Sequence, residues 1–153
     1  MTLLGYLFGN GGTTRKRTPK GFRVDIDPEA GYDKGSVLAD LYVGTQHIGR
    51  FIAGKIKSQR RLQVAHAFVL PDWERRGLGT KGYEALASWA CANNFVLTSD
   101  QARTDASEGF WKKQLTKGRA EYDSESRKYR LTSCAGDLGR LSSVKTSKHG
   151  KRP

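Results

Sequence analysis

The stretch from Val69 to Gly82 reads V-L-P-D-W-E-R-R-G-L-G-T-K-G. Its apolar start is typical of a strand, Pro71 ends that strand, and the glycines open directly into a helical pattern. Gly77 and Gly79 let the backbone approach a ligand closely, so amide N–H groups at a helix N-terminus can converge on phosphate oxygens. The stretch therefore predicts a pyrophosphate site. An ordinary basic turn between a strand and a helix is the competing interpretation.

The same residues resemble the acetyl-CoA-binding motif of the GNAT N-acetyltransferase superfamily. In that motif a strand ending in V-x-P is followed by five residues, a G-x-G turn and a long helix. This chain has Glu74 where the family usually has Gln or Arg. The resemblance implies acetyl-CoA as co-substrate, and the residues that would bind it are Val69, Arg75, Arg76, Gly77, Leu78, Gly79 and Thr80.

Length and charge predict one folded domain with basic ends. The chain has 153 residues, 37% of them hydrophobic, and a formal net charge of +12. The ends carry net +4 each, so we predict a basic flexible segment at 1–21, a GNAT-like domain at 22–132 and a basic disordered tail at 133–153. Such tails attract polyanions such as nucleic acid. They are equally consistent with a role in solubility alone.

The two cysteines, Cys91 and Cys134, predict no disulfide framework, and the three scattered histidines predict no metal site. A reducing cytoplasm fits this composition best. The apolar opening M-T-L-L-G-Y-L-F is far shorter than the roughly 20 residues of a membrane span. We therefore expect no membrane association.

Periodicity predicts the order of the elements. Alternating or apolar runs indicate strands at 22–26, 36–43, 47–56, 62–70 and 95–98, and a final hairpin at 120–132. Helical spacing predicts helices at 79–94 and from Asp105 or Ser107 to about Leu115. The resemblance implies an α+β fold with a mixed, mostly antiparallel central sheet and two main helices. The connection from Pro28 to Gly35 leaves no room for the two helices that the family usually has there. Either the acceptor groove is open or the N-terminal residues replace those helices.

Amine acylation needs a held thioester, an oxyanion stabiliser, a base and an acid. By resemblance, a backbone N–H near Val69 holds the thioester carbonyl, His66 on the fourth strand is the candidate base, and Ser99 and Asp100 orient the acceptor amine. Stabilisation of the cationic form of the amine is the other role open to Ser99 and Asp100, and Glu84 and Asp100 are weaker alternative bases. The competing interpretations are that His66 is packed in the strand and that Asp100 forms an ion pair with Arg103 in the loop.

The stretch from Ser99 to Trp111 is similar to short GNAT-like proteins of bacteriophages, and for a phage-encoded protein the expected location is the host cytoplasm. The family often has a tyrosine here that protonates the departing thiolate, and this chain has Phe110 at that spacing, which cannot donate a proton. We therefore expect Phe110 and Trp111 to form core and pocket wall.

The predicted function is an acetyl-CoA-dependent N-acyltransferase in which a primary amine attacks the thioester directly. The positive charge of the protein favours a macromolecular acceptor, such as nucleic acid, aminoacyl-RNA or a protein lysine. A basic hairpin tip would contact phosphates, or form only a solvated turn, through Lys55, Lys57, Arg60 and Arg61. The alternative function is a catalytically inactive GNAT-shaped module that binds nucleic acid or a host protein through these basic surfaces.

Overall fold

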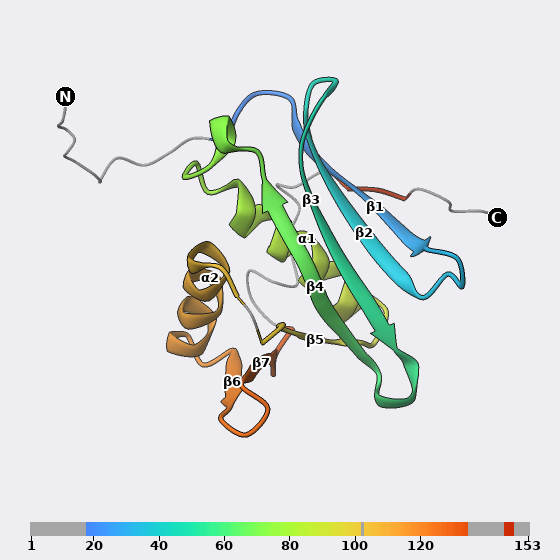
Figure 1. Cartoon of the computed structure of the whole chain (residues 1–153), viewed down its shortest axis with the longest axis vertical. Coiled ribbons are helices and arrows are strands. Elements are labelled where there is room, and N and C mark those ends of the chain that lie inside the picture. The colour runs from blue at the N-terminus through green and yellow to red at the C-terminus, as the bar shows by residue number, and fades with distance from the viewer. Residues whose placement is uncertain (1–17, 102, 135–145, 149–153) are drawn as a thin grey trace, which may run out of the picture.

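The computed structural model describes residues 18–101, 103–134 and 146–148, and Figure 1 shows their arrangement. Eight strands form one sheet in the order β6-β7-β5-β4-β3-β2-β1-β8. The strands are β1 (Phe22–Ala30), β2 (Ser36–Val43), β3 (Gln46–Ile56), β4 (Arg61–Val69), β5 (Val96–Thr98), β6 (Ala120–Asp123), β7 (Lys128–Leu131) and β8 (Thr146–Lys148). The helices are α1 (Leu78–Ala92) and α2 (Asp105–Thr116), and the short 3-10 helices are η1 (Lys57–Gln59) and η2 (Pro71–Trp73). The predicted α+β fold class is confirmed.

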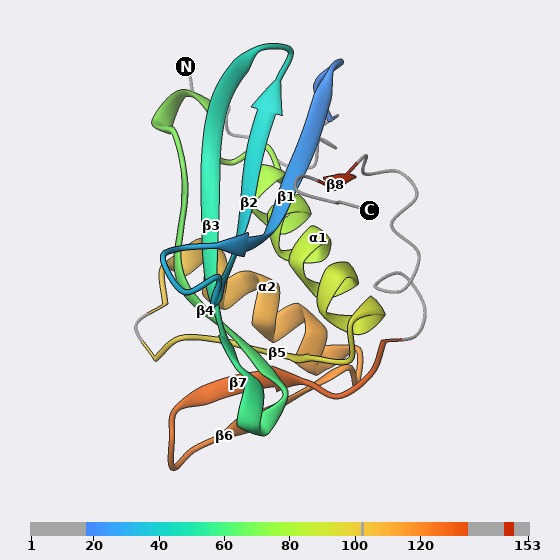
Figure 2. The same cartoon turned by 90° about the vertical axis from the view of Figure 1, so that its right-hand side faces the viewer.

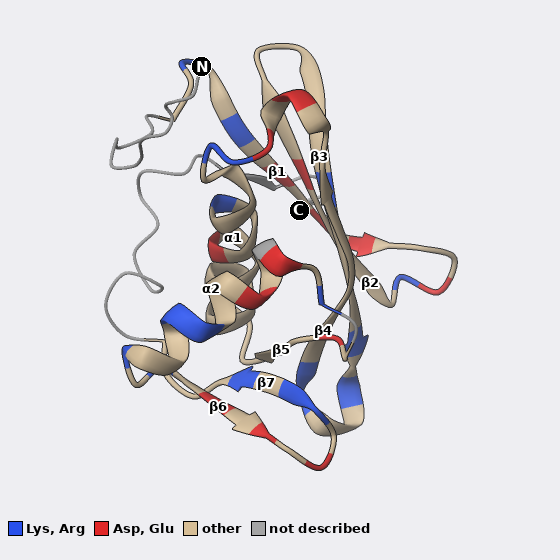
Figure 3. Ribbon diagram, turned by 60° about the vertical axis from the view of Figure 1, so that its left-hand side comes forward, with Lys and Arg blue, Asp and Glu red and all other residues tan. Residues whose placement is uncertain are grey.

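The core lies between the sheet and the two helices, which cover the same side of it (Figure 3). Strands β1 to β4 form an antiparallel meander, β5 joins β4 in parallel, and β7 joins β5 antiparallel. Because side chains alternate along a strand, every second residue of the meander faces α1. These buried residues include Val24, Ile26, Val37, Ala39, Leu41, Phe51, Ala53, Leu62 and Val64. The side of the sheet away from α1 and α2, called the open face below, has no helix on it among the described residues (Figure 2).

The connection between β1 and β2 is short, as predicted, and holds no helix. The expected loop from Pro28 to Gly35 is too long, however, because β1 continues to Ala30. The pairing of β1 with β2 is irregular between Asp27 and Ala30. Pro28 lies inside this irregularity, where its missing N–H interrupts no regular ladder.

Strand β8 belongs to the segment for which we expected a disordered tail. Its backbone pairs in parallel with β1, from Val24↔Thr146 to Ile26↔Lys148. Apart from 133–134 and 146–148 at the C-terminal end and 18–21 at the N-terminal end, the two basic end segments lie outside the described residues. None of the described helices is long and apolar enough to cross a membrane.

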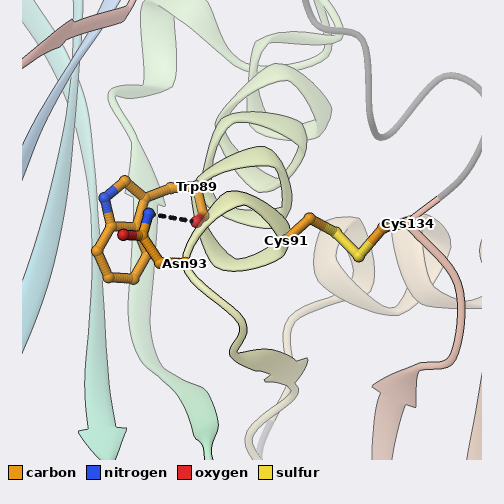
Figure 4. Close-up of a disulfide and its surroundings, with 4 residues drawn as sticks. All are labelled: Trp89, Cys91, Asn93 and Cys134. Carbon is orange, nitrogen blue, oxygen red and sulfur yellow. Dashed lines mark hydrogen bonds between the residues drawn. A yellow bond between two sulfur atoms is a disulfide. The ribbon is translucent and has the colours of Figure 1, made fainter.

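The expectation that the cysteines form no disulfide is wrong. Cys91 on α1 is bonded to Cys134, which follows β7, and their Cα atoms are 5.7 Å apart (Figure 4). Nearby, the side-chain amide of Asn93 donates a hydrogen bond of 2.8 Å to the carbonyl of Trp89 at the end of α1. Disulfides persist mainly in oxidising environments, so the argument from cysteine content for a reducing cytoplasm no longer holds.

Candidate active site

The turn before α1 leaves the N-terminus of this helix open to a ligand. Gly77 is the N-cap residue, with φ of 79°, and Arg75 has φ of 63°. No side chain caps the helix, and its first turn holds no acidic residue. The first N–H groups of an α-helix have no partner within the helix, so those of Leu78, Gly79 and Thr80 can donate to an anion.

Space and positive charge accompany these donors. A β-carbon built at Gly79 would have no described atom within 4 Å outside the helix's own first turn and its chain neighbours. The guanidinium of Arg76 lies 4.7 Å from the ring centroid of Trp73, which positions this exposed cation beside the turn. The residues from Arg75 to Thr80 thus lie together in one turn, while Val69 ends β4. Their role in binding a cofactor stays a prediction.

β4 and β5 part after a short parallel pairing. The pairing runs only from Arg61↔Val96 to Gln63↔Thr98. Immediately beyond it, the N–H of Ser99 donates to the carbonyl of Tyr129 on β7. From Val64 onward, β4 therefore pairs with β3 and not with β5. We call this divergence the fork. The turn before α1 lies at the same carboxyl end of the two strands, which is where parallel sheets commonly bind ligands.

A β-bulge in β4 determines which way His66 faces. Ala53 pairs with Val64, but its neighbour Ile52 pairs with His66, so Ala65 is an extra residue. Before the bulge Val64 faces the core, and after it Ala67 and Val69 do, which leaves His66 exposed on the open face. The interpretation of His66 as a packed histidine is therefore wrong. Its role as a base stays a prediction.

Ser99 and Asp100 follow β5 on the other arm of the fork. The Ser99 side chain is buried and its hydroxyl oxygen accepts a 2.8 Å hydrogen bond from the N–H of Tyr129. The same hydroxyl donates to the carbonyl of Asp100 over 3.1 Å. An Asp100 carboxylate oxygen accepts from the N–H of Gln101 over 2.7 Å. These contacts favour a positioning role for Ser99, since its hydroxyl holds β7 against the end of β5.

Arg103 joins the loop after β5 to α2 and β7, and its sequence context does not predict these contacts. Its guanidinium donates to a Glu108 carboxylate oxygen over 2.6 Å, and to the carbonyls of Asp100 and Arg127 over 2.6 and 2.8 Å. It also lies 4.8 Å from the ring centroid of Tyr129, whose hydroxyl donates to the second Glu108 oxygen over 2.8 Å. Arg103 therefore forms its ion pair with Glu108. Its contact with Asp100 is to the backbone carbonyl and not to the carboxylate. A lone arginine in a loop gives no sequence signal for such contacts.

The Arg103 contact makes the stability of the protein depend on pH through Glu108. Hydrogen bonding from Arg103 holds the pKa of Glu108 below its ordinary value. A lowered folded-state pKa stabilises the fold above the unfolded-state pKa, near 4.3, and this contribution is lost as pH falls through the folded-state pKa. Glu108→Gln is therefore expected to lower the free energy of unfolding by about 1 kcal/mol at pH 7. Urea denaturation at pH 7 and pH 3 measures this, and a difference that stays constant with pH would contradict it.

Phe110 is a core residue, as expected. Its ring stacks on that of Tyr83, with centroids 4.7 Å apart, and its side chain is buried. The hydroxyl of Tyr83 on α1 donates to the hydroxyl of Ser107 over 2.6 Å, and burial raises the pKa of Tyr83. Trp111 packs against both rings. These aromatic side chains join α1 to α2.

Three of the four basic residues at the hairpin of β3 and β4 have different surroundings. Arg60 donates to the carbonyls of Asn93 and Asn94, so it covers the C-terminal end of α1. Lys55 donates to the carbonyl of Lys34. Arg61 instead faces the open side of the sheet, because its neighbour Leu62 is buried in the core. Contact of these four cations with the phosphates of a nucleic acid stays a prediction.

No protein-family model matches this sequence, and no curated protein matches it. Among solved structures, the chain is similar to an acetyltransferase of Bacillus subtilis in complex with CoA. The TM-score is 0.54 at 9% identity, over 73% of this chain and 99% of that chain. A ribosomal-protein-S18-alanine N-acetyltransferase of Escherichia coli gives a TM-score of 0.49 at 18% identity, over 71% and 76% of the two chains. Tetrahymena GCN5 gives 0.49 at 20%, over 65% and 69%.

At such low identity these similarities establish the fold alone, and the fold is that of the GNAT acetyltransferases. The expected element order agrees with it, from the antiparallel meander through α1 and β5 to the final hairpin.

Proposed function

We propose that this protein is an acetyl-CoA-dependent N-acyltransferase, and that it acylates a primary amine of a macromolecule by direct attack on the thioester. The observation that carries the proposal is the uncapped N-terminus of α1 at the carboxyl end of the fork between β4 and β5. The similar acetyltransferase of Bacillus subtilis is in complex with CoA, which supports the same ligand for this fold.

The residues of the turn fit a pyrophosphate. The first N–H groups of α1 have no partner within the helix, the first turn of the helix holds no acidic residue, and Arg76 adds a cation. Gly79 leaves space beside these donors. Acetyl-CoA would supply an activated acyl group, and the turn would hold its phosphates while the reactive end enters the fork.

The chemistry requires a proton acceptor near the attacking amine. As the amine nitrogen forms its bond to the acyl carbon, the carbon–sulfur bond breaks and the nitrogen loses a proton. His66 faces solvent on the open face, directly after the bulge, and its imidazole nitrogen can accept a proton. Asp100 on the opposite arm would orient the amine, with Ser99 holding that arm in place.

His66→Ala is expected to lower the rate of acyl transfer about 100-fold, the usual effect of losing a general base. Acetyl-CoA affinity should change by less than about twofold, because His66 lies away from the phosphate turn. Initial rates of CoA release measure this with whichever acceptor reacts fastest: an amine-bearing oligonucleotide, an aminoacylated RNA or a lysine peptide.

His47→Ala is the matched control. His47 lies on the same open face, but its imidazole is hydrogen-bonded to Asp40 over 2.8 Å. Equal losses of rate in the two variants would show that His66 has no special part in the reaction.

The alternative is a GNAT-shaped binding module without catalysis, and the buried Phe110 favours it because no phenol stands at that position. Calorimetric titration with acetyl-CoA separates the two functions. An enzyme must bind the thioester, so absence of binding at millimolar acetyl-CoA would leave the binding module as the function.

A further inference from the structure

A pocket of about 300 Å³ lies on the open face beside the final hairpin. Its lining includes residues of four neighbouring strands: β4, β5, β6 and β7. The charged residues are Arg61, Glu121, Asp123, Lys128 and Arg130, and Thr98 lies between Arg61 and the final hairpin. Figure 3 shows basic residues on β7 and on the hairpin between β3 and β4, at the same end of the molecule.

The charged side chains of this pocket differ in their partners. On the side of β6, Glu121 is paired with Arg130 over 2.7 Å, and Asp123 accepts hydrogen bonds from Ser126 and from the N–H of Glu125. Arg61 and Lys128 form no ion pair with a described residue, although Lys128 pairs in register with Asp123 on β6. The nearest partner of Lys128 is the neutral side-chain oxygen of Gln63, at 3.1 Å. Arg61 on β4 and Lys128, which reaches toward β4, are therefore the cations of the pocket without an ion pair among the described residues, and they form its positive side.

This positive side adjoins the fork. Gln63 and Thr98 are the last residues through which β4 and β5 pair, and the ammonium of Lys128 reaches Gln63 across β5. Thr98 also pairs with Arg130 on β7. An anion bound by Arg61 and Lys128 would thus lie on the open face next to the point where the strands part, and on the same face as His66.

We propose that this pocket binds a phosphate group of a nucleic-acid acceptor. The assignment of the ligand as an acceptor rests on the function proposed above, but binding in the pocket does not. Two cations from different strands suit a phosphate, which has several charged oxygens, better than a carboxylate, which has two and is usually held by one forked arginine. Contacts of this kind position a nucleic acid without reading its sequence.

The test uses the full chain, a fluorescein-labelled hexauridylate and fluorescence anisotropy in the absence of acetyl-CoA. Arg61→Gln/Lys128→Gln is expected to weaken binding at least about 10-fold at low salt, because each lost phosphate contact removes favourable electrostatic interaction. The salt dependence should also become shallower, with the slope of log K against log salt changing by about 1.4, or about 0.7 for each contact.

Lys112→Gln/Lys113→Gln is the matched control, since it removes the same charge from exposed positions of α2 on the other side of the sheet. An equal loss of affinity in both double variants would overturn the proposal, as would equal binding of a labelled hexaglutamate. Circular dichroism and urea denaturation establish that each variant is folded.

Acetyl-CoA titrations of the same variants keep this proposal separate from the proposed function. Arg61→Gln/Lys128→Gln should keep the affinity of the unsubstituted protein for acetyl-CoA. If the unsubstituted protein binds hexauridylate through the pocket but does not bind acetyl-CoA, the acyltransferase proposal fails and the phosphate pocket stands. If acetyl-CoA binds and hexauridylate binding is insensitive to the two substitutions, the pocket proposal alone fails.

Discussion

Gly79→Val is expected to weaken acetyl-CoA binding about 30- to 100-fold while leaving the fold as stable as before. The loss corresponds to about 2–3 kcal/mol, the cost of one or two charge-assisted hydrogen bonds to phosphate. Open space surrounds the β-carbon position of Gly79, so the valine side chain meets no neighbouring element and occupies only the volume beside the helix N-terminus. Calorimetry gives the affinity, and urea denaturation gives the free energy of unfolding.

Gly82→Ala, in the same helix, is expected to lower the stability of the fold and to leave the affinity for acetyl-CoA unchanged. A β-carbon at Gly82 would lie 2.5 Å from a ring carbon of Phe51, in the packed interface between α1 and β3. Overpacking of this kind costs about 1–3 kcal/mol of stability. The folded fraction of this variant should bind acetyl-CoA as tightly as the unsubstituted protein does. If Gly79→Val keeps the full affinity, the turn is not the pyrophosphate site.

Removal of the disulfide is expected to lower the free energy of unfolding by about 4 kcal/mol. The bond joins residues 43 positions apart, and closing a loop of this length restricts the unfolded chain by about that amount. Cys91→Ser/Cys134→Ser should therefore unfold roughly 10–15 °C lower than the unsubstituted protein. Thermal and urea denaturation, each with and without a phosphine reductant, measure the effect.

The reductant supplies an internal control. It should lower the midpoint of the unsubstituted protein, in which Cys134 is exposed, and leave the double variant unchanged. If both proteins respond equally, or neither responds, the bond does not stabilise the fold. A single variant such as Cys134→Ser tests whether a free thiol at Cys91 adds an effect of its own.

Local patterns predicted most of the fold. The strand at 36–43 has the predicted bounds, and the helix predicted at 79–94 spans Leu78–Ala92. Both depend on regular alternation or helical spacing within one segment. β8 and the disulfide depend instead on contacts between distant segments, from Val24 to Thr146 and from Cys91 to Cys134, which no local pattern encodes.

The part of the candidate site that consists of backbone N–H groups, the turn before α1, could be predicted from the sequence. The glycine turn was recognised because glycines, a proline and a helical pattern follow in order. The orientation of His66 was not, since it depends on the unpaired Ala65 and on the register between β3 and β4. The engagement of Ser99 and Arg103 also escaped prediction, because their partners, Tyr129 and Glu108, come from other elements.

The extra residue in β4 also determines how this strand tolerates changes of length. Deleting Ala65 would restore continuous pairing with β3 and leave the facing of every later residue unchanged, because Ile52 already pairs with His66 and Phe51 with Ala67. Ala67 and Val69 would stay in the core, and His66 would stay on the open face. Deleting one residue after the bulge would instead reverse the facing of all residues that follow it, so this part of the strand accepts substitutions far more readily than changes of length.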